Sequence, residues 1–97
     1  MDETELHNLL GKIGKRIFVQ YFREFGNENI SNQEMIARLP NEYTFKSRTS
    51  RTSKSRRIFR EGLEEQALSM IADSERVEPS AAIEARTLLT HLRKDAA

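Results

Sequence analysis

Apolar residues recur at helical spacing along both ends of the chain. In the N-terminal quarter they lie three and four residues apart, which predicts a helix from Thr4 to about Phe25. Further apolar residues widen this stripe, as expected of a helix that is central in the fold or shared with a second subunit. Gly11 and Gly14 mark a break, a close helix contact or a turn between two shorter helices. The main stripe consists of Leu6, Leu10, Ile13, Ile17, Tyr21 and Phe25.

Three further helices are indicated. Ser31 and Glu34 form a capping box, and Pro40 disfavours helix at Leu39, so a short helix is expected from Asn32 to Arg38 or Leu39. An apolar stripe from Phe59 to Ile71 predicts a helix that starts between Ser50 and Ser55 and ends near Ser74. Pro79 suits the first position of a last helix.

No segment shows the alternation of a strand, so the fold class predicted is all-α, a small bundle of four or five helices. The length of 97 residues suits a single helical domain spanning residues 1–97. There is no cysteine, no secretory signal and no apolar run of about 20 residues, which favours a soluble, intracellular (cytoplasmic) protein.

Catalytic chemistry finds little support in the sequence. The two histidines, His7 and His91, lie at opposite ends of the chain, and neither has a partner at metal-ligand spacing. We therefore expect no enzyme activity, no metal site and no cofactor or small-molecule substrate.

Positive charge is concentrated between Lys46 and Arg60. This fifteen-residue segment holds seven of the sixteen Lys and Arg residues and no acidic one, which leaves nine Lys and Arg against fifteen Asp and Glu elsewhere. Since the formal net charge is only +1, any attraction to a polyanion must come from this segment. Its composition, Arg and Lys mixed with Ser and Thr, suits contact with nucleic-acid phosphates.

We therefore predict a nucleic-acid-binding protein, with double-stranded DNA as the expected partner and regulation as one role. The predicted contact residues are Lys46, Arg48, Arg51, Lys54, Arg56, Arg57 and Arg60, helped by Ser47, Ser50 and Ser53. The alternatives are a solvated surface loop and a protein-interaction module whose basic segment docks on an acidic partner. A membrane-surface role is disfavoured because the segment lacks an apolar side.

The local structure expected of this segment has two parts. No apolar residue occurs from Lys46 to Arg57, so the first half is predicted to be a loop that is mobile when unbound. The second half would place Lys54, Arg56 and Arg57 at a helix N-terminus. Because the helix dipole disfavours cations there, that arrangement suggests a bound phosphate.

Residues 31–60 show a weak resemblance to helix-turn-helix DNA-binding proteins. The segment from Gln33 to Leu39 is similar to the first helix of that motif, with the small Ala37 at the helix contact and Asn41 in the turn. The resemblance implies a recognition helix that begins near Ser50 and faces the major groove. The chain departs from the motif at positions 47 and 50, where serine replaces the apolar residues expected. A capped helix with no such role is the other interpretation.

Two further hypotheses rest on the N-terminal helix. The segment Gly11–Arg16 is slightly similar to the glycine loop of a KH domain and to the hairpin of a helix-hairpin-helix module, although glycines for helix packing explain it better. The wide apolar surface of residues 17–25 suggests a homodimer, which would bring two basic segments to one duplex.

Overall fold

Seven helices form the part of the chain that the computed structural model describes, the backbone of residues 1–96 and the side chains of residues 1–95; no strand is found there. The all-α prediction is confirmed, with seven helices rather than four or five. They are α1 (Glu3–Ile13), α2 (Lys15–Gln20), α3 (Phe22–Phe25), α4 (Asn32–Arg38), α5 (Phe45–Arg60), α6 (Glu64–Ala72) and α7 (Pro79–Ala96).

The higher count arises because two expected helices are divided. Gly14 ends α1 with φ 92° and ψ 115°, a conformation that side-chain-bearing residues rarely adopt, and α2 starts at the next residue. Tyr21 then separates α2 from α3. Gly62, with φ 72°, similarly separates α5 from α6 where one helix was predicted from about residue 50 to residue 74.

The predicted starts of α4 and α7 are confirmed. The Ser31 hydroxyl accepts a hydrogen bond from the Glu34 amide at 3.1 Å, and α4 ends at Arg38 before Leu39 and Pro40. The predicted capping box is only half formed, because the Glu34 carboxylate accepts a hydrogen bond from the Arg38 side chain, at 3.1 Å, instead of from the Ser31 amide. Helix α7 begins at Pro79, and its buried face consists of Ala81, Ala82, Ala85, Leu88 and Leu89.

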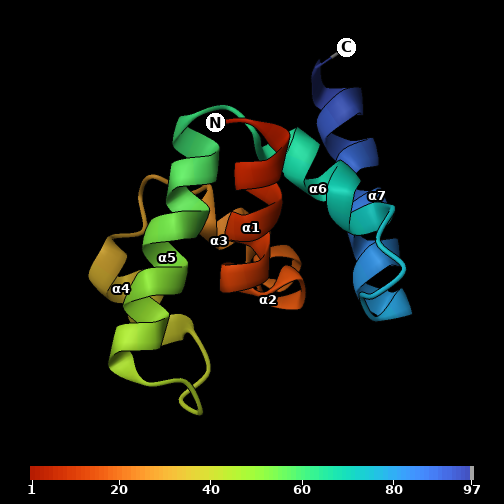
Figure 1. Ribbon diagram of the computed structural model, residues 1–97. Helices are drawn as coiled ribbons and strands as arrows, with labels where there is room; N and C mark the ends of the chain where they lie inside the picture. Colours follow the sequence, from red (N-terminus) through yellow and green to blue (C-terminus); the bar gives the residue numbers. More distant parts are fainter. Residues whose placement is uncertain (97) are drawn as a thin grey trace.

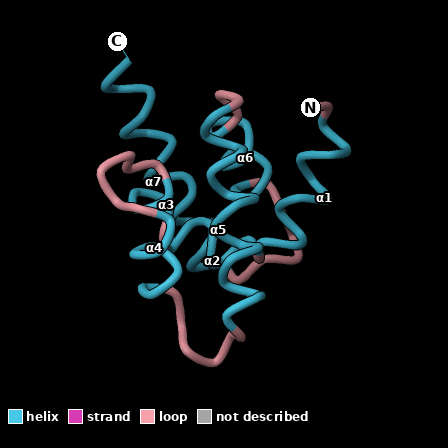
Figure 2. Tube along the Cα trace, turned by 90° about the vertical axis from the view of Figure 1, so that its left-hand side faces the viewer, coloured by secondary structure: helices cyan, strands magenta, loops and turns pink. Residues whose placement is uncertain are grey.

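Helix α1 lies in the middle of the molecule, between α5 on one side and α6 on the other (Figure 1). Helix α4 packs against α5, and α7 packs against both α6 and α2. The turned view in Figure 2 shows the connection between α4 and α5 as a protruding loop at one end of the molecule. The Cα radius of gyration is 12.8 Å, the size expected of one compact unit of this length.

Aromatic rings fill the centre of the core. Phe18 is fully buried, and its ring centroid lies 5.6 Å from that of Phe22 and 6.0 Å from that of Phe59. Gly26 makes room for this cluster, because a Cβ there would lie 2.7 Å from the Phe59 ring. The apolar residues between positions 17 and 25 are thus buried or half-buried within one chain, and the reason for expecting a homodimer through them does not hold.

The largest correction concerns α5, which is helical from Phe45 rather than from a point between Ser50 and Ser55. The Thr44 hydroxyl caps the helix by accepting from the Ser47 amide at 3.1 Å. The first half of the basic segment is therefore ordered helix and not a mobile loop. Its inner side is also packed: Thr52 is 1% exposed and Ser55 is 0% exposed.

Candidate nucleic-acid interface

Helix α5 carries the whole basic segment and contains no acidic residue. Its buried side is formed by Thr52, Ser55 and Ile58, which face α1 and the core. At about 100° per residue, positions 46, 50, 53, 57 and 60 fall on the opposite side. We call this side, together with the adjacent Lys54, the outer stripe of α5: Lys46, Ser50, Ser53, Lys54, Arg57 and Arg60.

The outer stripe extends over the length of the helix. From Lys46 to Arg60 it covers about 21 Å at 1.5 Å per residue. Lys46, Ser53 and Arg60 are exposed, whereas the other three members are half-buried. Cationic side chains and hydroxyl groups thus share one continuous, rigid surface, and their spacing is fixed by the helix.

Arg51, predicted to contact nucleic acid, holds α5 to the end of α1. Its guanidinium donates to the Ile13 carbonyl and lies 4.0 Å from the centroid of the Tyr43 ring. Its Nε also donates to the Ser47 hydroxyl at 3.0 Å, which engages a second predicted contact residue. The Ile13 carbonyl belongs to the last turn of α1, where such groups lack helical partners, so Arg51 completes that turn.

Two more of the predicted arginines hold α5 to α4 and to the preceding loop. Arg48 donates to the Ile36 carbonyl at 3.2 Å. Arg56 donates to the Ile30 carbonyl and to the Asn32 side chain, both at 2.7 Å. Together with Arg51, these arginines turn inward or sideways, so the structure does not bring all seven basic residues to one surface.

Of the remaining four cations, two have a partner one turn away in the chain and two have none among the described residues. Lys54 donates to the Ser50 hydroxyl one turn earlier. Arg57 forms an ion pair with Glu61 at 2.7 Å. Hydrogen bonding to Arg57 lowers the pKa of Glu61. Lys46 and Arg60 form no side-chain hydrogen bond or ion pair with the described residues, and both are open to a ligand.

The expected crowding of arginines at a helix N-terminus is also corrected. Because α5 starts at Phe45, Lys54 and Arg56 lie within the helix, while Arg57 and Arg60 occupy its last turn. Cations are favoured in that turn by the helix dipole. The argument for a phosphate at a helix N-terminus therefore fails, and on α5 the case for nucleic-acid phosphates rests on the outer stripe.

The pair α4–α5 has a longer connection than an ordinary helix-turn-helix motif. Six residues, 39–44, separate the two helices, against the usual three or four. The second helix begins at Phe45 rather than near Ser50, and Ser47 and Ser50 are half-buried. The motif expects buried residues at positions 47 and 50, but the residues of α5 that face the core are Thr52 and Ser55. Their small side chains suit close contact between helices.

Two features of this region escaped the sequence interpretation. Thr44 is a good cap residue, and it was the signal that could have located the start of α5. Phe45 is 68% exposed beside Lys46, which places an aromatic ring at one end of the outer stripe. Arginine contacts to backbone carbonyls leave no comparable sequence signal.

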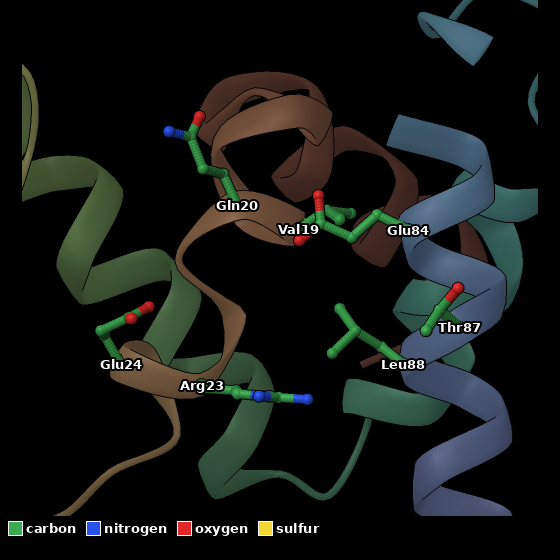
Figure 3. A pocket seen from close by; sticks show the side chains of 7 residues that line it. All are labelled: Val19, Gln20, Arg23, Glu24, Glu84, Thr87 and Leu88. Carbon is green, nitrogen blue, oxygen red and sulfur yellow. The ribbon is translucent and has the colours of Figure 1, made fainter. Parts of the chain in front are cut away.

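Outside α5, the described residues show neither a metal-binding cluster nor a pair of histidines. Figure 3 shows a hollow lined by residues of α2, α3 and α7, where Arg23 extends toward Leu88 and Glu24 points away.

His7 and His91 are both exposed. Within the described chain no three His, Asp or Glu side chains gather in a way that could hold a metal ion. None of the helices described there has the length and apolar character needed to cross a membrane.

The different roles of adjacent arginines can be tested by Arg56→Met and Arg57→Met. We expect Arg56→Met to lower the free energy of unfolding by about 2 kcal/mol, because it leaves the part-buried Ile30 carbonyl without its donor. Arg57→Met removes an ion pair whose side chains are 44% and 32% exposed, so a much smaller loss than that of Arg56→Met is expected. Urea denaturation of both variants measures the difference. Equal losses would contradict the assignment.

Comparison with known proteins gives no relative: no protein-family model, curated protein or solved structure matches this chain.

Proposed function

We propose that this protein binds nucleic acid, with double-stranded DNA as the preferred partner, through the outer stripe of α5. The observation that carries the proposal is a sixteen-residue helix without acidic residues, which gathers cations and hydroxyl groups on one side that is exposed or half-buried. Phosphates take charge-assisted hydrogen bonds from both kinds of group. The contact set proposed is Lys46, Ser50, Ser53, Lys54, Arg57 and Arg60.

The contacts of α5 support a rigid docking element. Arg48, Arg51 and Arg56 fix the helix to α4, α1 and the loop before α4, so the outer side chains are presented on an ordered backbone. Binding then costs less conformational entropy than it would for a loop that orders on the duplex. An exposed helix of this kind fits the major groove, which is about 12 Å wide.

A helix-turn-helix-like role for α4 and α5 remains part of this proposal, with α5 as the helix that meets the groove. Base readout would come from the arginines of the stripe, since a guanidinium can donate two hydrogen bonds to a guanine edge. A regulatory role is compatible with this mode of binding.

Titration of a duplex oligonucleotide at several salt concentrations tests the proposal. Four cationic contacts predict a slope of about −3.6 in log affinity against log salt, because each contact contributes about −0.9. Absence of binding at about 50 mM salt would overturn the proposal, including its sequence-independent form. A single-stranded oligonucleotide of the same length shows whether the duplex is preferred.

The second candidate function is docking on an acidic protein. Phe45 favours it, since an exposed aromatic residue beside cations is typical of protein-binding surfaces. The variant Phe45→Ala distinguishes the two functions. If phosphate contacts dominate, its affinity for duplex DNA should stay within about threefold of the wild type. If the partner is an acidic protein, its affinity for that protein should fall tenfold or more.

A further inference from the structure

A hollow of about 370 Å³ lies on another side of the molecule, where α1 meets α2. It brings together three regions far apart in the sequence: the α1–α2 junction, Tyr43 with Arg51 of α5, and the connection from α6 to α7. Its volume is at the lower end of the range for small-molecule sites, about 300–1,000 Å³. The charged residues that line it are Lys15, Arg16, Arg51, Arg76 and Glu78.

The charge of this hollow is one-sided. Four cationic residues and one carboxylate give an excess of +3. The hollow of Figure 3, by contrast, is lined by one arginine and two glutamates. None of the four cations takes part in an ion pair within the described residues. Cations that line one hollow repel one another, and an anion bound there would reduce that repulsion.

The walls of the hollow are built from specific contacts. Arg51 is fixed by the Ile13 carbonyl and the Tyr43 ring, and Gly14 leaves the space that its guanidinium occupies, since a Cβ there would lie 2.9 Å from Arg51 Nη1. Lys15 is drawn toward the α6–α7 connection, where its Nζ donates to the Ser74 hydroxyl at 3.2 Å. Two cations are thus pre-positioned without an acidic partner.

The Ile13 carbonyl at the end of α1 partly compensates the positive charge of Arg51. Most of the uncompensated charge of the hollow is therefore carried by its other three cations, Lys15, Arg16 and Arg76. Arg16 and Arg76 are exposed, and neither side chain forms a hydrogen bond in the described structure. Both can turn toward a ligand at no cost to the fold.

We propose that this hollow is a binding site for a phosphate group, carried either by inorganic phosphate or by a small phosphate monoester such as a nucleotide. Charge, donor type and size all favour it: guanidinium and ammonium groups are the side chains that hold phosphate, and a monoester carries nearly two negative charges at neutral pH. The site is separate from the outer stripe of α5 and needs no nucleic acid.

Amide chemical-shift titration of the full chain tests the proposal, with inorganic phosphate, AMP and adenosine as probes at constant ionic strength. Phosphate should produce saturable shifts at Gly11, Gly14 and Val77, with a dissociation constant on the order of 1 mM. Tighter binding of AMP assigns the hollow to a nucleotide, and equal affinity assigns it to phosphate itself; adenosine should not bind.

The variant Arg16→Gln/Arg76→Gln should keep the thermal midpoint of the wild type and bind phosphate at least tenfold more weakly. The matched control, Lys12→Gln/Lys94→Gln, removes the same charge from exposed positions outside the hollow and should bind as the wild type does. Shifts that do not saturate, or that are equal in the two double variants, would overturn the proposal.

Discussion

Replacement of Lys46, Lys54 and Arg60 by glutamine is expected to weaken duplex binding on the order of 100-fold at about 100 mM salt. Three charge-assisted phosphate contacts are lost, each contributing about 1 kcal/mol net. The log–log salt slope should become shallower by about 2.7, since each lost contact removes about 0.9. None of the three side chains has a hydrogen-bond or ion-pair partner outside α5 in the described residues, so the fold should be preserved.

A charge-matched control decides between a specific surface and general electrostatic attraction. Lys12→Gln/Arg23→Gln/Lys94→Gln also removes three positive charges, at exposed positions on α1, α3 and α7. If the outer stripe of α5 is the interface, this variant should change affinity by less than about threefold. An equal loss in both triple variants, measured by fluorescence anisotropy over the same salt series, would rule out α5 as the contact surface.

Substitution of alanine at Gly14 is expected to lower the free energy of unfolding by about 3 kcal/mol. Its φ of 92° is costly for any residue with a Cβ, and the added atom would lie 2.9 Å from Arg51 Nη1. Displacement of Arg51 would also leave the Ile13 carbonyl without its donor. For a domain of this length, the thermal midpoint should fall by roughly 12–24 °C, at about 4–8 °C per kcal/mol.

The same substitution at Gly11 should have the opposite sign. Gly11 lies inside α1, and in the described structure nothing outside its own helix backbone and chain neighbours lies within 4 Å of an added Cβ. Gly11→Ala should therefore stabilise the protein by about 0.5–1 kcal/mol, because alanine restricts the unfolded chain and favours helix. Thermal denaturation of both variants makes the comparison. Destabilisation by Gly11→Ala, or tolerance of Gly14→Ala, would contradict the helix break described here.

Much of the fold could be predicted because apolar periodicity and capping residues are local signals. The Ser31 cap, the start at Pro79 and the apolar stripe of α1 all correspond to helices in the structure. The helix breaks were harder to predict, because a glycine within an apolar stripe can either continue the helix or end it. Gly11 continues α1 and Gly14 ends it, and the two differ in backbone φ and in the space around an added Cβ, neither of which the sequence shows.

The start of α5 was mispredicted for a different reason. Helix prediction relies on apolar residues, and α5 has none between Phe45 and Ile58. Its inner side packs through Thr52 and Ser55, and its arginines bond to backbone carbonyls of other elements. A carbonyl acceptor has no sequence signature, so these contacts could not be predicted.

The sequence by itself determined that this protein is all-α and that its positive charge is concentrated between Lys46 and Arg60. Both properties depend only on the order of residues, since apolar spacing indicates helices and the positions of Lys and Arg give the charge distribution. The tertiary structure alone decided which of those charges are available. Close packing of α5 against α1 and α4 directs Arg48, Arg51 and Arg56 to backbone carbonyls, since buried carbonyls need donors. On the side of α5 that faces away from this packing, Lys46, Lys54 and Arg60 make no hydrogen bond or ion pair with another described element.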